Sequence, residues 1–139
     1  MSSAQSTLES GGSPAGWPET ISARLSELGP WQTLSWLFEE RNRHPEELSL
    51  RGYIEILRSV LVKDFLSNAQ GIRAVPKLSP EFLADFGRFN LSAQEGYLIS
   101  LIDGRTNIEK LLKLSPFDPF STLFNLARLQ QQKAIVVPQ

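Results

Sequence analysis

The feature that most constrains the fold is a succession of helix-start signals between Leu91 and Val137. The run "SAQE" from Ser92 fits a capping box, in which the Ser and Glu side chains satisfy backbone N–H groups of the first helical turn. The run "TNIE" from Thr106 repeats this pattern, and Asp118 precedes a proline that suits a first helical position. The stretch closes in "KAIVVP", rich in β-branched residues. It therefore predicts three helices followed by a short strand.

Apolar packing has to stabilise this fold. The chain has 139 residues and no cysteine, which excludes disulfides, thiolate zinc sites and cysteine nucleophiles. This length suffices for one domain with a core plus a tail or a small second lobe. With 14 Lys and Arg against 15 Asp and Glu, the net charge of -1 gives no global attraction to nucleic acid or an anionic membrane.

Neither a membrane span nor a signal peptide is predicted. No apolar run approaches the roughly 18 residues that a spanning helix needs. The N-terminus lacks the basic-then-apolar order of a secretory signal. We therefore expect a soluble protein with a cytoplasmic location.

Composition and helix signals divide the chain into three predicted parts. Residues 1–16 are rich in Ser, Thr and Gly, and are expected to be a disordered tail or a docking segment that folds on binding. Residues 17–76 form a predicted helical lobe. Residues 77–139 form a predicted winged-helix-like lobe. The expected fold class is therefore mainly α, with the helical lobe packed on a winged-helix-like unit that carries a short β element.

The helical lobe has three predicted helices. The first runs from Trp17 and stops at Gly29, and the second runs from Pro30 to His44. The third and longest spans Pro45–Asn68, where apolar residues extend beyond a single stripe. This helix is either a core helix or the surface of a homodimer, and both alternatives stay open.

Short elements are predicted at the junction of the two lobes. "IRAVP", residues 72–76, is expected to be a short strand. Ser79 is expected to cap a short helix that begins at Pro80 and ends near Phe86.

The last third of the chain resembles the C-terminal winged-helix-like segment of bacterial PATAN domains, named for the N-terminal region of PatA, and of related uncharacterised signalling and motility-associated domains. The residues that carry the resemblance are "LSAQEGYLISLIDGRTNIEKLL" and "LFNLARLQQQKAIVV". The shared pattern is a Ser-started helix, an "IDG" turn, a second helix like "T-x-x-E-L", and a third helix followed by a strand. The resemblance implies a regulatory adaptor in a bacterial signalling or motility system.

The charge pattern of the third helix favours a protein partner over DNA. A DNA-reading winged helix places its last helix in the major groove and anchors it on phosphates. Here Arg128 and Lys133 lie late in that helix, and its first half has no cation. From residue 77 onward there are seven Lys or Arg against six Asp or Glu. In the alternative, a DNA-binding transcriptional regulator, Arg128, Lys133 and Arg105 would contact the nucleic acid.

Two pairs of residues are candidates for partner binding. Phe117 and Phe120 flank the turn "SPFDPF", where one of them is expected to be an exposed anchor; the alternative is that both belong to the core. Arg41 and Arg43 lie in "FEERNRHPEE", either on a solvated helix face or on a polar rim that meets an acidic partner.

No enzymatic chemistry is predicted. His44 is the only histidine, so histidine-pair metal sites and Ser-His-Asp triads are not supported. Neither a phosphate-binding loop nor a dinucleotide fingerprint occurs. The sequence therefore predicts a non-catalytic protein-interaction adaptor with no catalytic site, cofactor or metal.

Overall fold

The computed structural model describes residues 16–67 and 70–138, so the predicted tail lies outside the described residues except for Gly16. The described part is mainly helical, as predicted, with six α-helices and one small antiparallel sheet. Its packing divides the chain into two compact units, Met1–Val60 and Leu61–Gln139. This division falls within a helix, whereas the sequence-based division lies at residues 76/77. None of the helices in the described residues is long and apolar enough to cross a membrane.

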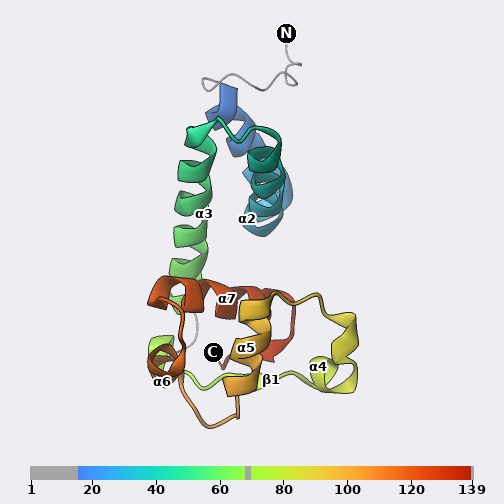
Figure 1. Ribbon diagram of the computed structural model, residues 1–139, viewed down its shortest axis with the longest axis vertical. Coiled ribbons are helices and arrows are strands. Elements are labelled where there is room, and N and C mark those ends of the chain that lie inside the picture. The colour runs from blue at the N-terminus through green and yellow to red at the C-terminus, as the bar shows by residue number, and fades with distance from the viewer. Residues whose placement is uncertain (1–15, 68–69, 139) are drawn as a thin grey trace. The chain divides into compact units, whose positions relative to one another are not determined.

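The first unit begins with a helix that doubles back on itself. Helix α2 spans Trp17–Arg43, but Gly29 within it has φ 83° and ψ 171°, far from helical values. The rings of Trp17 and Trp36 lie 6.1 Å apart, whereas a straight helix would separate them by about 28 Å. The predicted stop at Gly29 and restart at Pro30 are therefore confirmed, and α2 is a helical hairpin (Figure 1).

The second helix of this unit starts later than predicted. Helix α3 spans Leu48–Ser67, so it begins at Leu48 rather than at Pro45; the predicted end, Asn68, lies outside the described residues. Pro45 begins a turn in which the Glu47 N–H donates to the His44 carbonyl at 3.0 Å. His44 ends α2 with non-helical dihedral angles, so the chain needs this turn before a new helix can begin.

One face of α3 is buried and a neighbouring face is not. In the first unit Leu50, Ile54 and Leu57, which are spaced three or four residues apart, are buried. Ile56 and Val60 remain 62% and 51% exposed. The buried stripe makes α3 a core helix of its unit, while the homodimer through this helix stays a prediction.

The second unit contains the small sheet and four further α-helices. Strand β1 pairs antiparallel with β2, so that Lys77 lies opposite Val136 and Leu78 opposite Ile135. Figure 1 shows the order of the elements. After the end of α3, their bounds are η2 Gly71–Arg73, β1 Lys77–Leu78, α4 Pro80–Ala84, η3 Phe86–Arg88, α5 Ala93–Leu101, α6 Ile108–Leu114, α7 Pro119–Gln131 and β2 Ile135–Val136.

The strand predicted at residues 72–76 is wrong. Residues 71–73 form a 3₁₀ turn, and the strand lies later, at Lys77–Leu78. The backbone before it bonds elsewhere, because the Ala74 carbonyl accepts the N–H of Ile108 at the start of α6, at 2.9 Å. A two-residue strand depends on where its partner lies rather than on local propensity.

Side-chain caps start all four helices, largely as predicted. Ser79, Ser92 and Asp118 each accept a backbone N–H, and the capping box at Ser92 is complete. The second predicted box is wrong, since Asn107 rather than Thr106 caps α6 and accepts the N–H of residue 110 at 2.8 Å. Asn is a stronger N-cap than Thr. Helix α4 ends at residue 84, short of the predicted 86.

Helix α7 lies at the centre of the second unit. It contacts α5, α6 and β2. Its buried residues are Thr122, Phe124, Asn125, Leu126, Ala127 and Leu129. Since they occupy almost every face of the helix, α7 is a core element.

Candidate functional site

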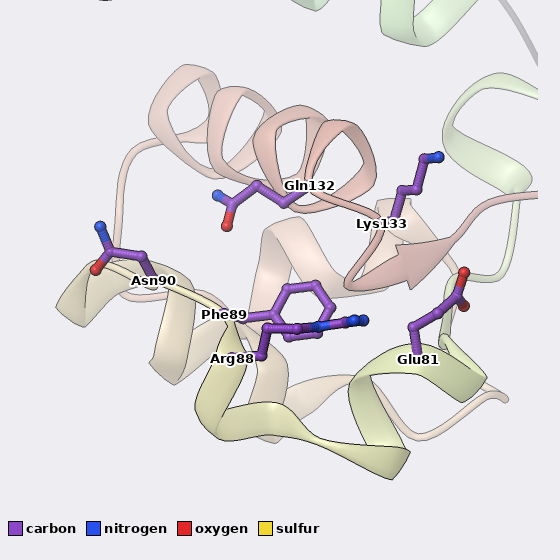
Figure 2. A pocket seen from close by; sticks show the side chains of 6 residues that line it. All are labelled: Glu81, Arg88, Phe89, Asn90, Gln132 and Lys133. Carbon is purple, nitrogen blue, oxygen red and sulfur yellow. The ribbon is translucent and has the colours of Figure 1, made fainter.

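The second unit carries a polar pocket of about 520 Å³ near the end of α7. Three segments form it: helix α4, the residues that end and follow η3, and the turn between α7 and β2. Such a volume falls in the usual range of ligand sites. Figure 2 shows the side chains that line it: Glu81, Arg88, Phe89, Asn90, Gln132 and Lys133.

Lys133 lines the pocket, and the way in which α7 ends determines the position of this residue. Its backbone φ is 67°, the left-handed region. The Lys133 N–H donates to the Gln130 carbonyl at 3.0 Å, and the Ala134 N–H donates to the Leu129 carbonyl at 2.9 Å. These two bonds form a Schellman motif, whose left-handed residue is usually Gly. A residue with a side chain at this position lowers the folding stability by about 1 kcal/mol relative to Gly.

Ser79 fixes the backbone of Lys133 against the start of α4. The Ser79 hydroxyl donates to the Lys133 carbonyl at 2.6 Å and accepts the Phe82 N–H at 3.0 Å. The Ser79 N–H donates to the Ala134 carbonyl at 3.0 Å. Ser79 itself is buried, so the turn that carries Lys133 and the helix that carries Glu81 are held together.

Phe89, which lines the pocket, belongs to an aromatic cluster. The ring of Phe82 lies 5.3 Å from that of Phe89 and 5.7 Å from that of Phe86. The Arg88 guanidinium lies over the Phe89 ring, 5.2 Å from its centroid. Phe82 is buried, but Phe86 is 65% exposed and its neighbour Leu83 is 61% exposed. We refer to Leu83 and Phe86 as the α4–η3 surface.

Several hydrogen-bond donors that line the pocket have no acceptor among the described residues. Among residues 16–67 and 70–138, neither Arg88 nor Lys133 forms an ion pair. The Gln132 Nε2 is buried and has no hydrogen-bond partner there. Glu81 supplies a carboxylate; in Figure 2 Arg88 extends toward its side of the pocket, and Lys133 lies above it. The lining residues therefore carry a formal charge of +1.

A second hollow of about 360 Å³ adjoins the pocket. Glu81 and Lys133 line both. Beyond them its walls include Ile135, Val136 and Val137, of which Val136 is 50% exposed. A donor-rich pocket and an aliphatic hollow therefore lie on either side of the same two charged residues.

The predicted aromatic anchors lie outside this site. Phe117 and Phe120 are both half-buried near the start of α7. The Phe117 ring meets that of Tyr97 edge-on at a centroid distance of 5.9 Å. Neither lines the pocket, and their role in partner binding stays a prediction.

The predicted cations of the first unit have contacts on their own helix. The Arg41 guanidinium lies over the Phe38 ring at 5.2 Å, and Arg43 pairs with Glu40 at 2.7 Å. The ion pair is of the i, i+3 kind expected for a solvated helix face. These two cations and the two predicted aromatic anchors thus belong to different compact units.

Three residues are expected to contact DNA in the alternative function, and one of them, Arg128, pairs with a carboxylate of its own unit. Its Nε lies 3.3 Å from Oε2 of Glu95, a fully buried carboxylate, although the geometry is not that of a hydrogen bond. The Glu95 Oε1 accepts the Ser92 N–H of the capping box. Lys133 lines the pocket, as described above.

Arg105 lies in the exposed turn between α5 and α6. Its backbone N–H and that of Thr106 donate to Oδ1 of Asp103 at 2.8 and 2.9 Å. These bonds, with one from the Thr106 hydroxyl, lower the pKa of Asp103 below its ordinary value. Asp103 therefore stabilises this turn as a carboxylate.

Sequence reasoning misses most of the pocket, because its residues come from segments far apart in the chain. One local signal exists: the third helix ends in "QQQKA" without Gly, so a residue with a side chain has to adopt the left-handed conformation.

Within the described residues, no group of three or more His, Asp or Glu side chains could hold a metal ion. Comparisons with protein-family models, with curated proteins and with solved structures found no match to this chain.

Proposed function

We propose that this chain is a non-catalytic protein-interaction module, and that a segment of a partner protein docks on the α4–η3 surface and in the adjoining pocket. The observation that carries this proposal is the exposure of Phe86 and Leu83 beside a pocket of unpaired donors. Protein interfaces combine such apolar anchors with a polar surround.

The aromatic cluster explains how Phe86 could act as an anchor. Its ring packs on buried Phe82, which in turn packs on Phe89 in the pocket wall. This support orders the ring before a partner arrives, so less conformational entropy is lost on binding. The remaining exposed area of Phe86 and Leu83 is apolar surface that a partner would remove from water.

The alternative of a DNA-binding winged helix has less support. Helix α7 would be the recognition helix, yet six of its 13 residues are buried, on almost every face of the helix. Arg128 pairs with Glu95, which leaves few cations for phosphate contacts. The winged-helix classification, and a place in bacterial signalling or motility, rest on the sequence resemblance and are part of this proposal.

Selection from a library of random displayed peptides tests the proposal. The full chain should enrich peptides that contain large apolar residues. The double variant Leu83→Ala, Phe86→Ala should lose at least about tenfold in affinity for them, because hot-spot truncation costs over about 1 kcal/mol per residue. Leu48→Ala is the matched control, since Leu48 is 70% exposed and belongs to the first unit.

The same preparation should be titrated with mixed duplex DNA at low and moderate salt. Tight binding that weakens steeply with salt, with no peptide enriched, would favour the DNA alternative. Peptide enrichment that survives the double variant would place the docking surface elsewhere.

A further inference from the structure

We infer that the pocket beside Lys133 binds a carboxylate, so that the partner segment carries an acidic side chain next to an aliphatic one. This inference rests on the proposed function and adds the chemistry of the partner. Three features of the pocket support it: the backbone of Lys133, the unpaired donors, and the hollow on the other side of Glu81.

The backbone of Lys133 is the first feature. A left-handed residue in a Schellman motif is most favourable as Gly, and Lys stands there instead. Its ammonium group forms no ion pair with the described part of the chain. Non-Gly residues held in this region are concentrated at functional sites. Since Lys133 is exposed, its ammonium group is available to a ligand.

The second feature is the number of donors among the residues that line the pocket. Arg88 and Lys133 bring charged donors, and the Gln132 Nε2 is a buried donor with no acceptor among the described residues. An ionised carboxylate offers about four acceptor positions and no donor, which matches this set. Hydrogen bonds between ionised groups are the strong ones, and a guanidinium fits a carboxylate with two parallel bonds.

The adjoining hollow selects a peptide over a phosphate-bearing ligand. Its aliphatic wall, Ile135, Val136 and Val137, offers nothing to a phosphodiester chain but would cover an aliphatic side chain. Glu81 stands between the two hollows and limits the net charge to +1. A multiply charged polyanion gains little there, whereas a single carboxylate matches a net charge of +1.

Three substitutions test the inference on the full chain. The probe is the synthetic consensus of the selected peptides, compared with the same peptide in which Asp and Glu are replaced by Asn and Gln. Arg88→Gln and Lys133→Gly should each weaken binding of the acidic probe about tenfold, the size of one charged hydrogen bond. Glu81→Gln should tighten it by about threefold, because it removes a repelling charge.

The amide probe supplies the control for charge. It should bind weakly to the parent chain and respond little to any of the three substitutions. Lys133→Gly should leave the melting temperature unchanged or raised, since Gly suits the left-handed position, so lost binding would not reflect lost folding. Affinity for the acidic probe should fall with salt.

The outcomes separate this inference from the proposed function. Enriched peptides without acidic residues, unaffected by Arg88→Gln but lost in the Leu83 and Phe86 double variant, would overturn the carboxylate site and leave the docking surface standing. No enriched peptide at all would overturn both. Equal or tighter binding of inorganic phosphate or duplex DNA, weakened by the same two substitutions, would reassign the pocket to phosphate.

Discussion

The two compact units stabilise their helices by different means. In the first unit α2 is interrupted at Gly29 and has no side-chain cap at its N-terminus. In the second unit α4, α5, α6 and α7 have 5, 9, 7 and 13 residues, and each begins with a side-chain cap. Isolated helices shorter than about 12–15 residues are marginal in water. Side-chain caps therefore define where the helices of the second unit begin, whereas the hairpin of the first unit relies more on burial and on the geometry of its reversal at Gly29.

Different probes can follow the two units separately. All three tryptophans, Trp17, Trp31 and Trp36, lie in the first unit. Tryptophan fluorescence therefore reports on its unfolding, while amide hydrogen exchange in α5 and α7 reports on the second unit. The following substitutions use these probes to break or sharpen the contrast between capped and hairpin helices.

The largest effect is expected from Arg128→Leu in the second unit. It leaves the fully buried Glu95 carboxylate without its cation, and an uncompensated buried charge costs about 3 kcal/mol. Hydrogen exchange in α5 and α7 should accelerate accordingly. Arg105→Leu is the control, because Arg105 is exposed and has no ion pair with the described residues. Equal effects of both would show that Glu95 does not depend on Arg128.

A smaller loss is expected from Gly29→Ala in the first unit. At φ 83° and ψ 171° only Gly is unstrained, and a side chain there costs about 2 kcal/mol. Gly52→Ala is the matched control: its added Cβ meets nothing within 4 Å, and its φ is not positive. That change should gain about 0.5–1 kcal/mol from helix propensity. Urea unfolding followed by tryptophan fluorescence should give opposite signs, and the same sign for both would contradict the hairpin.

Thr33→Val should stabilise the first unit by about 1 kcal/mol. The Thr33 hydroxyl is buried and has no hydrogen-bond partner among the described residues, so its desolvation is not compensated. Valine keeps the shape and removes the unsatisfied group. The urea midpoint of tryptophan fluorescence should rise. A fall would mean that the hydroxyl has an acceptor in solution, for example an ordered water.

The smallest effect, and one that depends on pH, concerns Asp103. Its pKa is lowered by hydrogen bonds from the backbone of Arg105 and from Thr106. The carboxylate therefore stabilises the turn above the unfolded pKa of about 4, and this contribution is lost as pH falls through the folded pKa. Asp103→Ala should lower the melting temperature slightly at neutral pH and less at acidic pH. If the difference in melting temperature between the parent and the variant grew on acidification, Asp103 would not stabilise the turn as a carboxylate.

Local chemistry makes much of this fold predictable. The caps at Ser79, Ser92 and Asp118 and the helix break at Gly29 are predicted correctly, because each depends on residues within one turn of chain. The predicted start of α3 and position of β1 are wrong, because each depends on a turn or a partner strand that lies outside the local pattern.

The candidate site is predictable only in one residue. The sequence singles out Lys133 as a cation late in the third helix, but assigns it to DNA contact in the alternative function. Arg88, Asn90 and Gln132 join it through packing between α4, the η3 segment and the end of α7. No periodic pattern in the sequence predicts that these residues lie close together. The exposure of Phe86 is equally hidden, since aromatic residues at helical spacing are usually buried.

The pairing of β1 with β2 also bears on folding kinetics. Nearly the whole second unit separates the two strands in sequence, yet only two residue pairs join them. Closing so long a loop carries an entropic penalty that a short ladder repays poorly until the helices between have formed. We therefore expect the helices to form first and the ladder last. Because Ser79 and Lys133 are joined directly beside this ladder, the pocket would be completed in the final folding step.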